Sequence, residues 1–97
     1  MSTLLTLNVK DGTGRRYVAR LPDSQAVATL QVVRPDPRHW IVQETEVPRA
    51  LRGRGVSLSL AARVLADAAA AGARITALCP TFQAHVDRHP PWRQHLS

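Results

Sequence analysis

The chain has 97 residues, a length that suits one small domain and excludes several. Hydrophobic residues make up 44% of it and charged residues 21%, an ordinary balance for a folded soluble protein, which excludes wholesale disorder. Thirteen Lys and Arg against seven Asp and Glu give a formal net charge of +6, which favours a polyanionic partner such as nucleic acid or a phosphate-bearing cofactor.

The sequence carries no signal for a membrane. No apolar stretch reaches the roughly 18 to 20 residues that a membrane-spanning helix needs, and the first residues lack the basic region of a signal peptide. We therefore expect a cytoplasmic protein without a membrane partner. The single cysteine, Cys79, excludes an internal disulfide and a multi-cysteine metal site.

Four segments in the first half of the sequence have the composition of strands. Residues 3–9 form a weak apolar run, which predicts a short first strand or a frayed arm before the turn-forming residues 11–14. Stronger runs follow at residues 16–21, 26–33 and 39–47, each followed by a proline within two residues. Together they predict an antiparallel meander of three to four strands.

The second half changes to a helical period. From Val56 to Gly72 apolar residues recur at three- and four-residue spacing, with eight alanines between residues 61 and 73. Arg63 and Asp67 are spaced for an ion pair on this helix, and Gly72 suits its end.

The remaining residues predict a strand and a second helix. Residues 74–79 form a short apolar run that ends before Pro80, and residues 81–88 predict a helix with Thr81 as its N-cap. We expect the tail from Trp92 to pack loosely. The order of elements predicts an α/β fold of the α+β kind in one domain, residues 1–97, with the meander followed by helix, strand and helix.

A glycine-rich segment lies between the meander and the long helix and reads Leu51-Arg52-Gly53-Arg54-Gly55-Val56-Ser57. The unpaired N–H groups and the dipole of a helix N-terminus favour an anion, and glycines let a phosphate approach the backbone. Arg52 and Arg54 add positive charge. A Gly-x-Gly pair alone is weak evidence, but its place between a strand and a helix predicts a pyrophosphate-binding loop.

Four short motifs follow one another along the chain: Glu44-Thr45-Glu46-Val47-Pro48, Leu51-Arg52-Gly53-Arg54-Gly55, Leu78-Cys79-Pro80 and Arg88-His89-Pro90. Together they resemble the short, single-domain GNAT-like proteins of the GNAT superfamily of N-acetyltransferases, over residues 17–92. The resemblance implies a GNAT core, acetyl-CoA (coenzyme A) as cofactor and a pantetheine channel between the strands that end near Val47 and Cys79. The cofactor-binding residues that it implies are Val47, Arg52, Gly53, Arg54, Gly55, Val56, Ser57 and His89.

The chain departs from the pattern of the family it resembles. Glu44 stands where family members usually carry histidine, and Ser57 replaces the final Gly or Ala of the cofactor signature. Serine is small enough to fit and can bond a phosphate, so we expect weakened rather than lost binding. Thr81 and His85 stand where the family prefers aromatic residues, and we expect them to reshape the acceptor side of the pocket.

Three residues are candidates for the chemistry of acetyl transfer, which needs a neutral amine and a proton for the departing thiolate. Glu44 and Glu46 lie two apart on a strand and share one face, so they are candidate bases or, alternatively, a solvated acidic edge. Glu46 is favoured because it matches the motif. The resemblance places Cys79 near the thioester, either to form an acetyl-enzyme or to reprotonate coenzyme A. A buried structural cysteine is the alternative.

The four histidines do not predict a metal site. His85 and His89 have a zinc-compatible spacing on the second helix, but no third ligand stands in a fixed relation to them. We expect His89 to cap the helix or to touch the cofactor.

Three functions are compatible with the sequence. The favoured one is an acetyl-CoA-dependent N-acetyltransferase with an amine acceptor of unknown identity. A non-catalytic acyl-CoA-binding module is the alternative, motivated by the departures at Ser57 and Glu44. A nucleic-acid-binding protein is the least favoured, because aromatic residues are few and the arginines are scattered. The small size also favours a homodimer.

Overall fold

The computed structural model describes residues 6–11 and 14–96, which form one five-stranded sheet, two α-helices and two short 3-10 helices. In chain order the elements are β1 (Thr6–Asp11), β2 (Gly14–Arg20), β3 (Ala28–Asp36), β4 (His39–Glu46), η1 (Arg49–Leu51), α1 (Val56–Ala70), β5 (Arg74–Ala77), α2 (Pro80–Arg88) and η2 (Pro90–His95).

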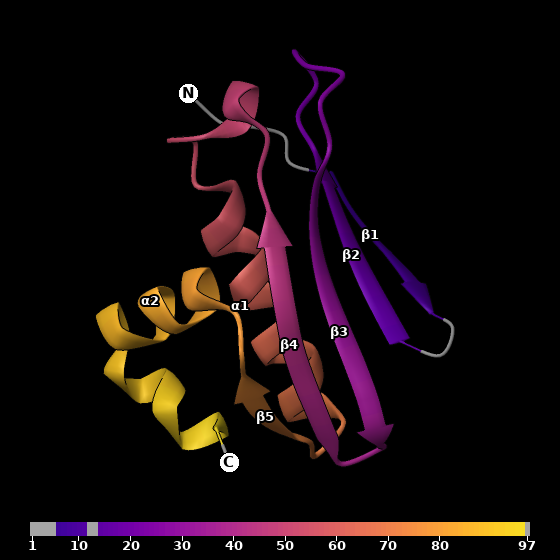
Figure 1. Cartoon of the computed structure of the whole chain (residues 1–97), viewed down its shortest axis with the longest axis vertical. Helices are drawn as coiled ribbons and strands as arrows, with labels where there is room; N and C mark the ends of the chain where they lie inside the picture. Colours follow the sequence, from indigo (N-terminus) through magenta and orange to yellow (C-terminus); the bar gives the residue numbers. More distant parts are fainter. Residues whose placement is uncertain (1–5, 12–13, 97) are drawn as a thin grey trace.

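The sheet has the strand order β1-β2-β3-β4-β5 (Figure 1). The first four strands are antiparallel neighbours, and β5 lies parallel to β4 after the crossover through α1. The predicted mixed fold is confirmed, with four strands in the meander. Residues 3–5 of the predicted first strand lie outside the described residues. Strand β3 continues through Pro35 to Asp36, beyond the predicted break, because an irregularity in its pairing with β4 accommodates the proline.

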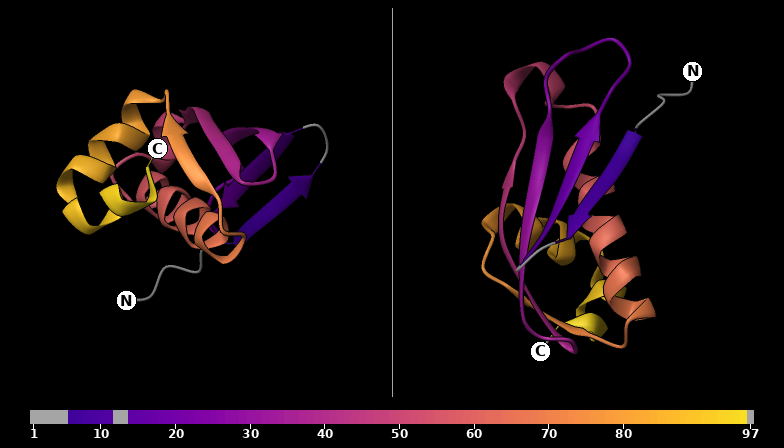
Figure 2. Two further views of the ribbon diagram at one scale, coloured as in Figure 1. Left: turned by 90° about the horizontal axis from the view of Figure 1, so that it is seen from below. Right: turned by 90° about the vertical axis from the view of Figure 1, so that its right-hand side faces the viewer.

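Helix α1 packs across one face of the sheet, against β2, β3 and β5 (Figures 1 and 2). The helix buries Val56, Leu60, Val64 and Ala68, which recur every fourth residue as the sequence predicts. They join one hydrophobic core with buried side chains of the strands, including Leu30 and Val32. None of the helices in the described ranges combines the length and the apolar character that a membrane span requires.

Helix α2 begins one residue earlier than predicted. Pro80 is its first residue, because a fixed φ and a missing N–H suit the first turn of a helix. Cys79 therefore holds the N-cap position that the sequence assigned to Thr81, and it makes no side-chain capping bond. The strand before it ends at Ala77 rather than at Cys79.

The C-terminal tail is packed, so the expectation of a loose extension is wrong. Pro90–His95 forms the 3-10 helix η2, and both Trp92 and Leu96 are partly buried against the core. Leu96 also makes a parallel bridge with Ile75, the second residue of β5. The tail therefore covers part of the free edge of β5.

Strand β4 contains one extra residue, Gln43, relative to β3. The register pairs Val42 with Val32 and then Glu44 with Gln31, so Gln43 has no opposite residue. Because side chains alternate between faces, this bulge puts Thr45 on the same face as Val42, toward α1. The two glutamates at positions 44 and 46 consequently point to the opposite face.

Strands β4 and β5 separate beyond their last pair, Val42 with Ala77. The N–H groups of Leu78 and Cys79 both donate to the Val42 carbonyl, at 3.0 and 3.2 Å, and the chain then turns away into α2 (Figure 1). Strand β4 continues to Glu46. Within the described residues, the end of β4 therefore has no neighbouring strand on the side of β5.

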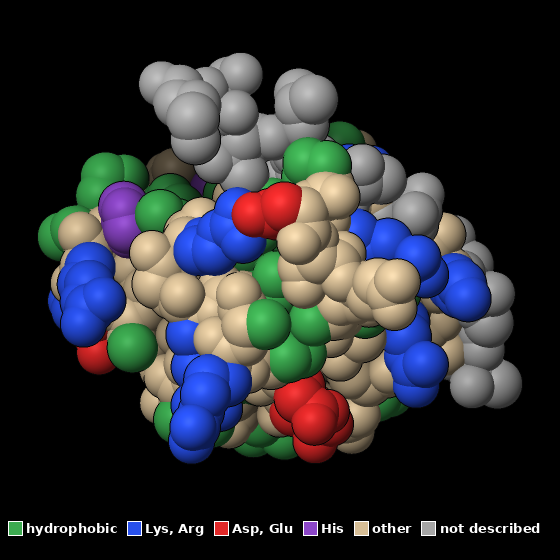
Figure 3. Space-filling model, turned by 90° about the horizontal axis from the view of Figure 1, so that it is seen from above, with side chains coloured by type: hydrophobic (Ala, Val, Ile, Leu, Met, Phe, Trp, Pro, Cys, Tyr) green, Lys and Arg blue, Asp and Glu red, His purple; other side chains and the backbone are tan. Residues whose placement is uncertain are grey.

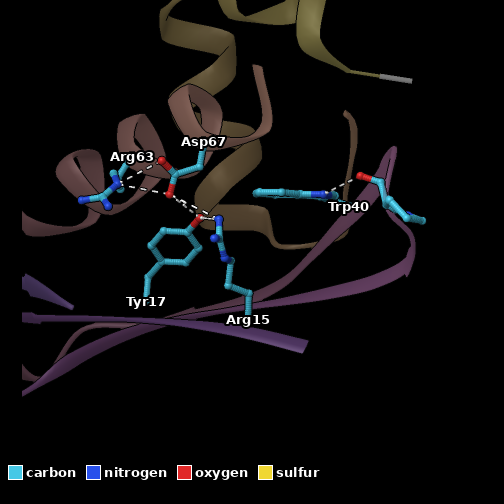
Figure 4. Close-up of polar contacts among 6 residues, drawn as sticks. Arg15, Tyr17, Trp40, Arg63 and Asp67 are labelled. Carbon is cyan, nitrogen blue, oxygen red and sulfur yellow. Dashed lines mark hydrogen bonds and ion pairs between the residues drawn. The ribbon is translucent and has the colours of Figure 1, made fainter. Parts of the chain in front are cut away.

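A polar contact links the sheet to α1 (Figure 4). The Tyr17 hydroxyl of β2 donates to Asp67 of α1 at 2.8 Å, and Arg63 and Arg15 contact the same carboxylate at 3.1 and 3.4 Å. The predicted pair of Arg63 and Asp67 is thus confirmed. Burial, and then the hydrogen bond and charge of Asp67, raise the pKa of Tyr17 far above its usual range, so the phenol stays a donor.

Replacing this donor tests the link between sheet and helix. Tyr17→Phe is expected to lower the free energy of unfolding by about 1 kcal/mol, because it removes the hydrogen bonds of the hydroxyl with Asp67 and Arg15 but leaves Asp67 with its arginine partners. Urea unfolding measures the change. Asp87→Asn, which removes an ion pair with Arg93 that is exposed on both sides, is the control and is expected to change stability negligibly. Equal losses in the two variants would contradict the prediction.

Candidate functional site

A pocket of about 360 Å³ lies where the separated end of β4 meets the N-termini of α1 and α2. Its lining residues are Thr45, Val47, Leu51, Arg52, Gly53, Gly55, Val56, Ser57 and Thr81. Seen from this end of the molecule, apolar side chains gather at the centre, with basic side chains to the left and right and acidic side chains above and below (Figure 3). The pocket lining thus combines apolar side chains with one guanidinium, that of Arg52.

The first turn of α1 contributes backbone donors to this wall. The helical hydrogen bonds begin with the Ser59 N–H, which donates to the Gly55 carbonyl at 3.0 Å. The amides of Val56, Ser57 and Leu58 precede that bond, and in the described part of the chain no side chain caps them. The turn also lacks an acidic residue. Its amides and the helix dipole therefore favour an anion in the pocket.

Two glycines shape the loop before α1. Gly53 and Gly55 have φ angles of 75° and 76°, in the left-handed region that side chains with a Cβ rarely adopt. A Cβ built on either glycine would meet no atom of the described residues within 4 Å. The loop is therefore open at both glycines, which leaves room for a polyphosphate beside its backbone.

The two arginines of the loop have different partners. Arg52 lines the pocket, and its Nε donates to the Val47 carbonyl at 3.1 Å. Arg54 forms an ion pair with Asp23 at 3.0 Å, and their hydrogen bond lowers the pKa of Asp23. Arg54 is not among the lining residues, although Gly53 and Gly55 on either side of it are.

The sequence matches the family model of the GCN5-related N-acetyltransferases over residues 16–96. The chain belongs to this family. The resemblance carried by the four motifs is confirmed, and the mixed sheet with its crossover helix is a GNAT-like domain. A search of the curated proteins finds no match to the chain.

Two departures from the GNAT pattern contact each other. Ser57 of α1 and His85 of α2 are joined by a hydrogen bond of 2.9 Å between Oγ and Nε2. Thr81, the third departure on this side, lines the same pocket as Ser57. That His85 and Thr81 reshape the acceptor side stays a prediction; in the structure both lie beside the glycine loop before α1.

Cys79 lies behind the pocket wall. Its side chain is 2% exposed, and its Sγ–H donates to the Thr45 hydroxyl at 3.4 Å. Thr45 lines the pocket, whereas Cys79 does not. Thr45 therefore lies between the thiol and the pocket.

Glu44 and Glu46 are exposed on the face of the sheet opposite α1. They share one face, as predicted, but neither lines the pocket. Glu44 and Glu46 therefore lie on the side of β4 opposite Thr45.

His89 lies outside the pocket. It is the C-cap residue of α2, its Nδ1 donates to the His85 carbonyl at 2.7 Å, and its ring stacks on Trp92 with centroids 4.4 Å apart. The prediction that His89 caps the second helix is confirmed. Its alternative, contact with the cofactor, stays a prediction. Among the described residues no group of three or more His, Cys, Asp or Glu is arranged to hold a metal ion.

Sequence reasoning missed Thr45 as a pocket residue. Uniform alternation from the buried Trp40 and Val42 would turn Glu44 and Glu46 inward, and Thr45 outward. The signal that could have found it is the odd spacing between Val42 and Val47, two apolar residues five positions apart. Both can face the core only if the strand contains an extra residue.

The burial of Cys79 makes its reactivity a direct test of the site geometry. We expect 5,5′-dithiobis(2-nitrobenzoate) to modify the thiol of the folded protein at least about tenfold more slowly than that of the protein unfolded in urea. The absorbance of the released thiolate measures both rates. Thr45→Ala, which removes the partner and opens the wall, is expected to accelerate the reaction of the folded protein. A fast reaction in the wild type would contradict the burial.

Proposed function

We propose that this GNAT domain binds acetyl-CoA in the pocket at the N-terminus of α1 and transfers the acetyl group to an amine. One observation carries the proposal. The uncapped amides of α1, the open glycine loop and the unpaired end of β4 meet in a single pocket. These are the features that a ligand with a pyrophosphate and an extended amide-containing arm requires.

The backbone of the loop and the first turn of α1 would hold the pyrophosphate. The amides of Val56, Ser57 and Leu58 supply hydrogen-bond donors in a turn that contains no acidic residue. Arg52 supplies a guanidinium at the pocket wall. Arg54 contributes less while Asp23 holds it, so binding relies on the amides more than on that side chain.

The end of β4 would hold the pantetheine arm. Its backbone from Thr45 to Val47 has no strand partner toward β5 within the described residues, so its polar groups can pair with the amides of the arm. Val47 and Leu51 provide the apolar wall beside it. Arg52 already occupies the Val47 carbonyl, which limits the backbone acceptors that remain.

Acetyl-CoA, when bound, supplies an acyl group activated as a thioester. Glu46, with Glu44 beside it, would accept a proton from an amine that approaches from the exposed face of the sheet. On the other side, the Cys79 thiol and the Thr45 hydroxyl form a hydrogen-bonded pair that can deliver a proton to the departing sulfur. The burial of Cys79 favours this acid role over an acetyl-enzyme.

A non-catalytic acyl-CoA-binding module is the second candidate. It is favoured by the exposure of both glutamates and by the burial of the only cysteine, since none of these three groups lines the pocket. The two candidates share the cofactor site and differ only in turnover.

Calorimetric titration with acetyl-CoA tests the site. We expect saturable binding with a dissociation constant in the range of about 1 to 100 μM. Gly55→Glu is expected to weaken it at least about tenfold, because a carboxylate beside the α1 amides repels phosphate. Gly72→Glu is the matched control, since Gly72 has a similar φ of 68° and open surroundings at the other end of α1. Equal affinities of the two variants, or no binding by the wild type, would refute the proposed site.

Release of coenzyme A with a panel of small amines, polyamines and peptides tests turnover. With the best acceptor, Glu46→Gln is expected to lower kcat about a hundredfold through loss of the base. Glu44→Gln, a change of the same kind two residues away, is expected to have a smaller effect. Binding without turnover for any amine would favour the non-catalytic module.

A further inference from the structure

The contact between Ser57 and His85 joins two elements at the wall of the proposed cofactor pocket. Ser57 lies in the first turn of α1 and lines the pocket, whereas His85 lies in the middle of α2, 28 residues further along. Their Oγ and Nε2 atoms are 2.9 Å apart. The hydroxyl next to the α1 amides is thus oriented by a titratable ring.

We propose that His85 is a positioning residue for the phosphate-bearing ligand, and that ligand binding is coupled to proton uptake from solvent by His85. In the bound state the Nε2–H of His85 donates to Ser57 Oγ, and the Ser57 hydroxyl donates to a phosphate oxygen. The inference rests on the proposed function, since it needs an anion in that pocket.

The single proton of the Ser57 hydroxyl gives the pair two arrangements. When Nε2 of a neutral His85 carries no hydrogen, it accepts the hydroxyl proton, and the serine turns its lone pairs toward the pocket. Lone pairs repel phosphate oxygens. When Nε2 carries a hydrogen, it donates to Oγ and frees the hydroxyl proton for the ligand. Protonation of His85 places hydrogens on both ring nitrogens and so guarantees the second arrangement.

The surroundings of His85 in the free protein disfavour its cation. Partial burial, followed by the charges of Arg88 and His89, lowers the pKa of His85 below its usual range. Arg52 adds positive charge at the pocket wall. The first turn of α1 offers no acidic residue as compensation.

The charged residues of helix η2 do not offset the positive charge around His85. The helix carries Arg93 and His95, and Arg93 is paired with Asp87 of α2 at 3.4 Å.

A bound phosphate would bring negative charge close to His85, so the pKa of His85 should be higher in the complex than in the free protein. By linkage, the affinity for the anion rises as the pH falls through the pKa of His85 in the complex.

Titration of the wild type with dephospho-coenzyme A at pH 5.5, 6.5 and 7.5 tests this coupling. This probe keeps the pyrophosphate and lacks the phosphate monoester of coenzyme A. That monoester titrates at about pH 6 and would add a pH dependence of its own. We expect binding to be about threefold tighter at pH 5.5 than at pH 7.5, because the pKa of His85 is higher in the complex than in the free protein. Ser57→Ala and His85→Phe are expected to show nearly constant affinity over this range.

His39→Phe is the matched control. His39 also bonds a hydroxyl, that of Thr76 at 2.7 Å, but it lies at the first residue of β4, the end of the strand away from the pocket. This variant is expected to keep the pH profile of the wild type. If Ser57→Ala and His85→Phe keep it as well, the coupling is refuted while the cofactor site stands.

A measurement on the wild type alone avoids reliance on the folding of the variants. Proton resonances of the His85 ring, followed against pH by nuclear magnetic resonance, are expected to give a higher pKa with saturating dephospho-coenzyme A than without it. An unchanged pKa would refute the proposal. Failure of the wild type to bind the probe at every pH would refute the cofactor site and this coupling together.

Discussion

One extra residue in β4 determines which side chains face the pocket. The bulge at Gln43 reverses the alternation after Val42, so that Thr45 turns toward α1 and the two glutamates turn to the opposite face. Without it, Glu44 and Glu46 would enter the core side, where two carboxylates would be desolvated next to buried apolar residues. The bulge therefore keeps the acids in water and provides the pocket with a hydroxyl and an apolar side chain, Thr45 and Val47. It also separates the proposed base and the proposed acid onto two faces of the sheet.

The opening beside β4 has a second local cause in the chain that follows β5. Proline restricts the residue before it to extended geometry and suits the first turn of a helix, so Pro80 ends the strand and starts α2. Leu78 and Cys79 both bond to the carbonyl of Val42, and no later residue extends the ladder along β4 among the described residues. Two features of the sequence, an odd residue in β4 and a proline after β5, thus leave the end of β4 free to bind an extended ligand.

Much of the fold could be predicted because it depends on local signals. The period of α1, Gly72 at its end, and the prolines and glycines between strands act within a few residues of the structure that they determine. The pocket loop was predictable for the same reason, since Gly53 and Gly55 precede a helix directly. Strand register is different, because it depends on partners far along the chain, and the faces of Glu44 and Glu46 follow from it. The packing of Trp92 and Leu96 likewise depends on β5 and α2, which the tail sequence does not reveal.

The contact between Ser57 and His85 shows why two departures from the family pattern are better understood together than separately. A serine alone at the end of the glycine loop adds a hydroxyl whose proton has no fixed direction, and a histidine alone on α2 adds a polar ring to a partly buried position. Joined at 2.9 Å, each satisfies a polar group of the other. The pairing also places a titratable group one hydrogen bond from the α1 amides, where the field of an anion is strongest. Since Arg54 is paired with Asp23, which offsets part of its charge, the direction of the Ser57 hydroxyl proton affects a bound phosphate more than it would beside an unpaired guanidinium.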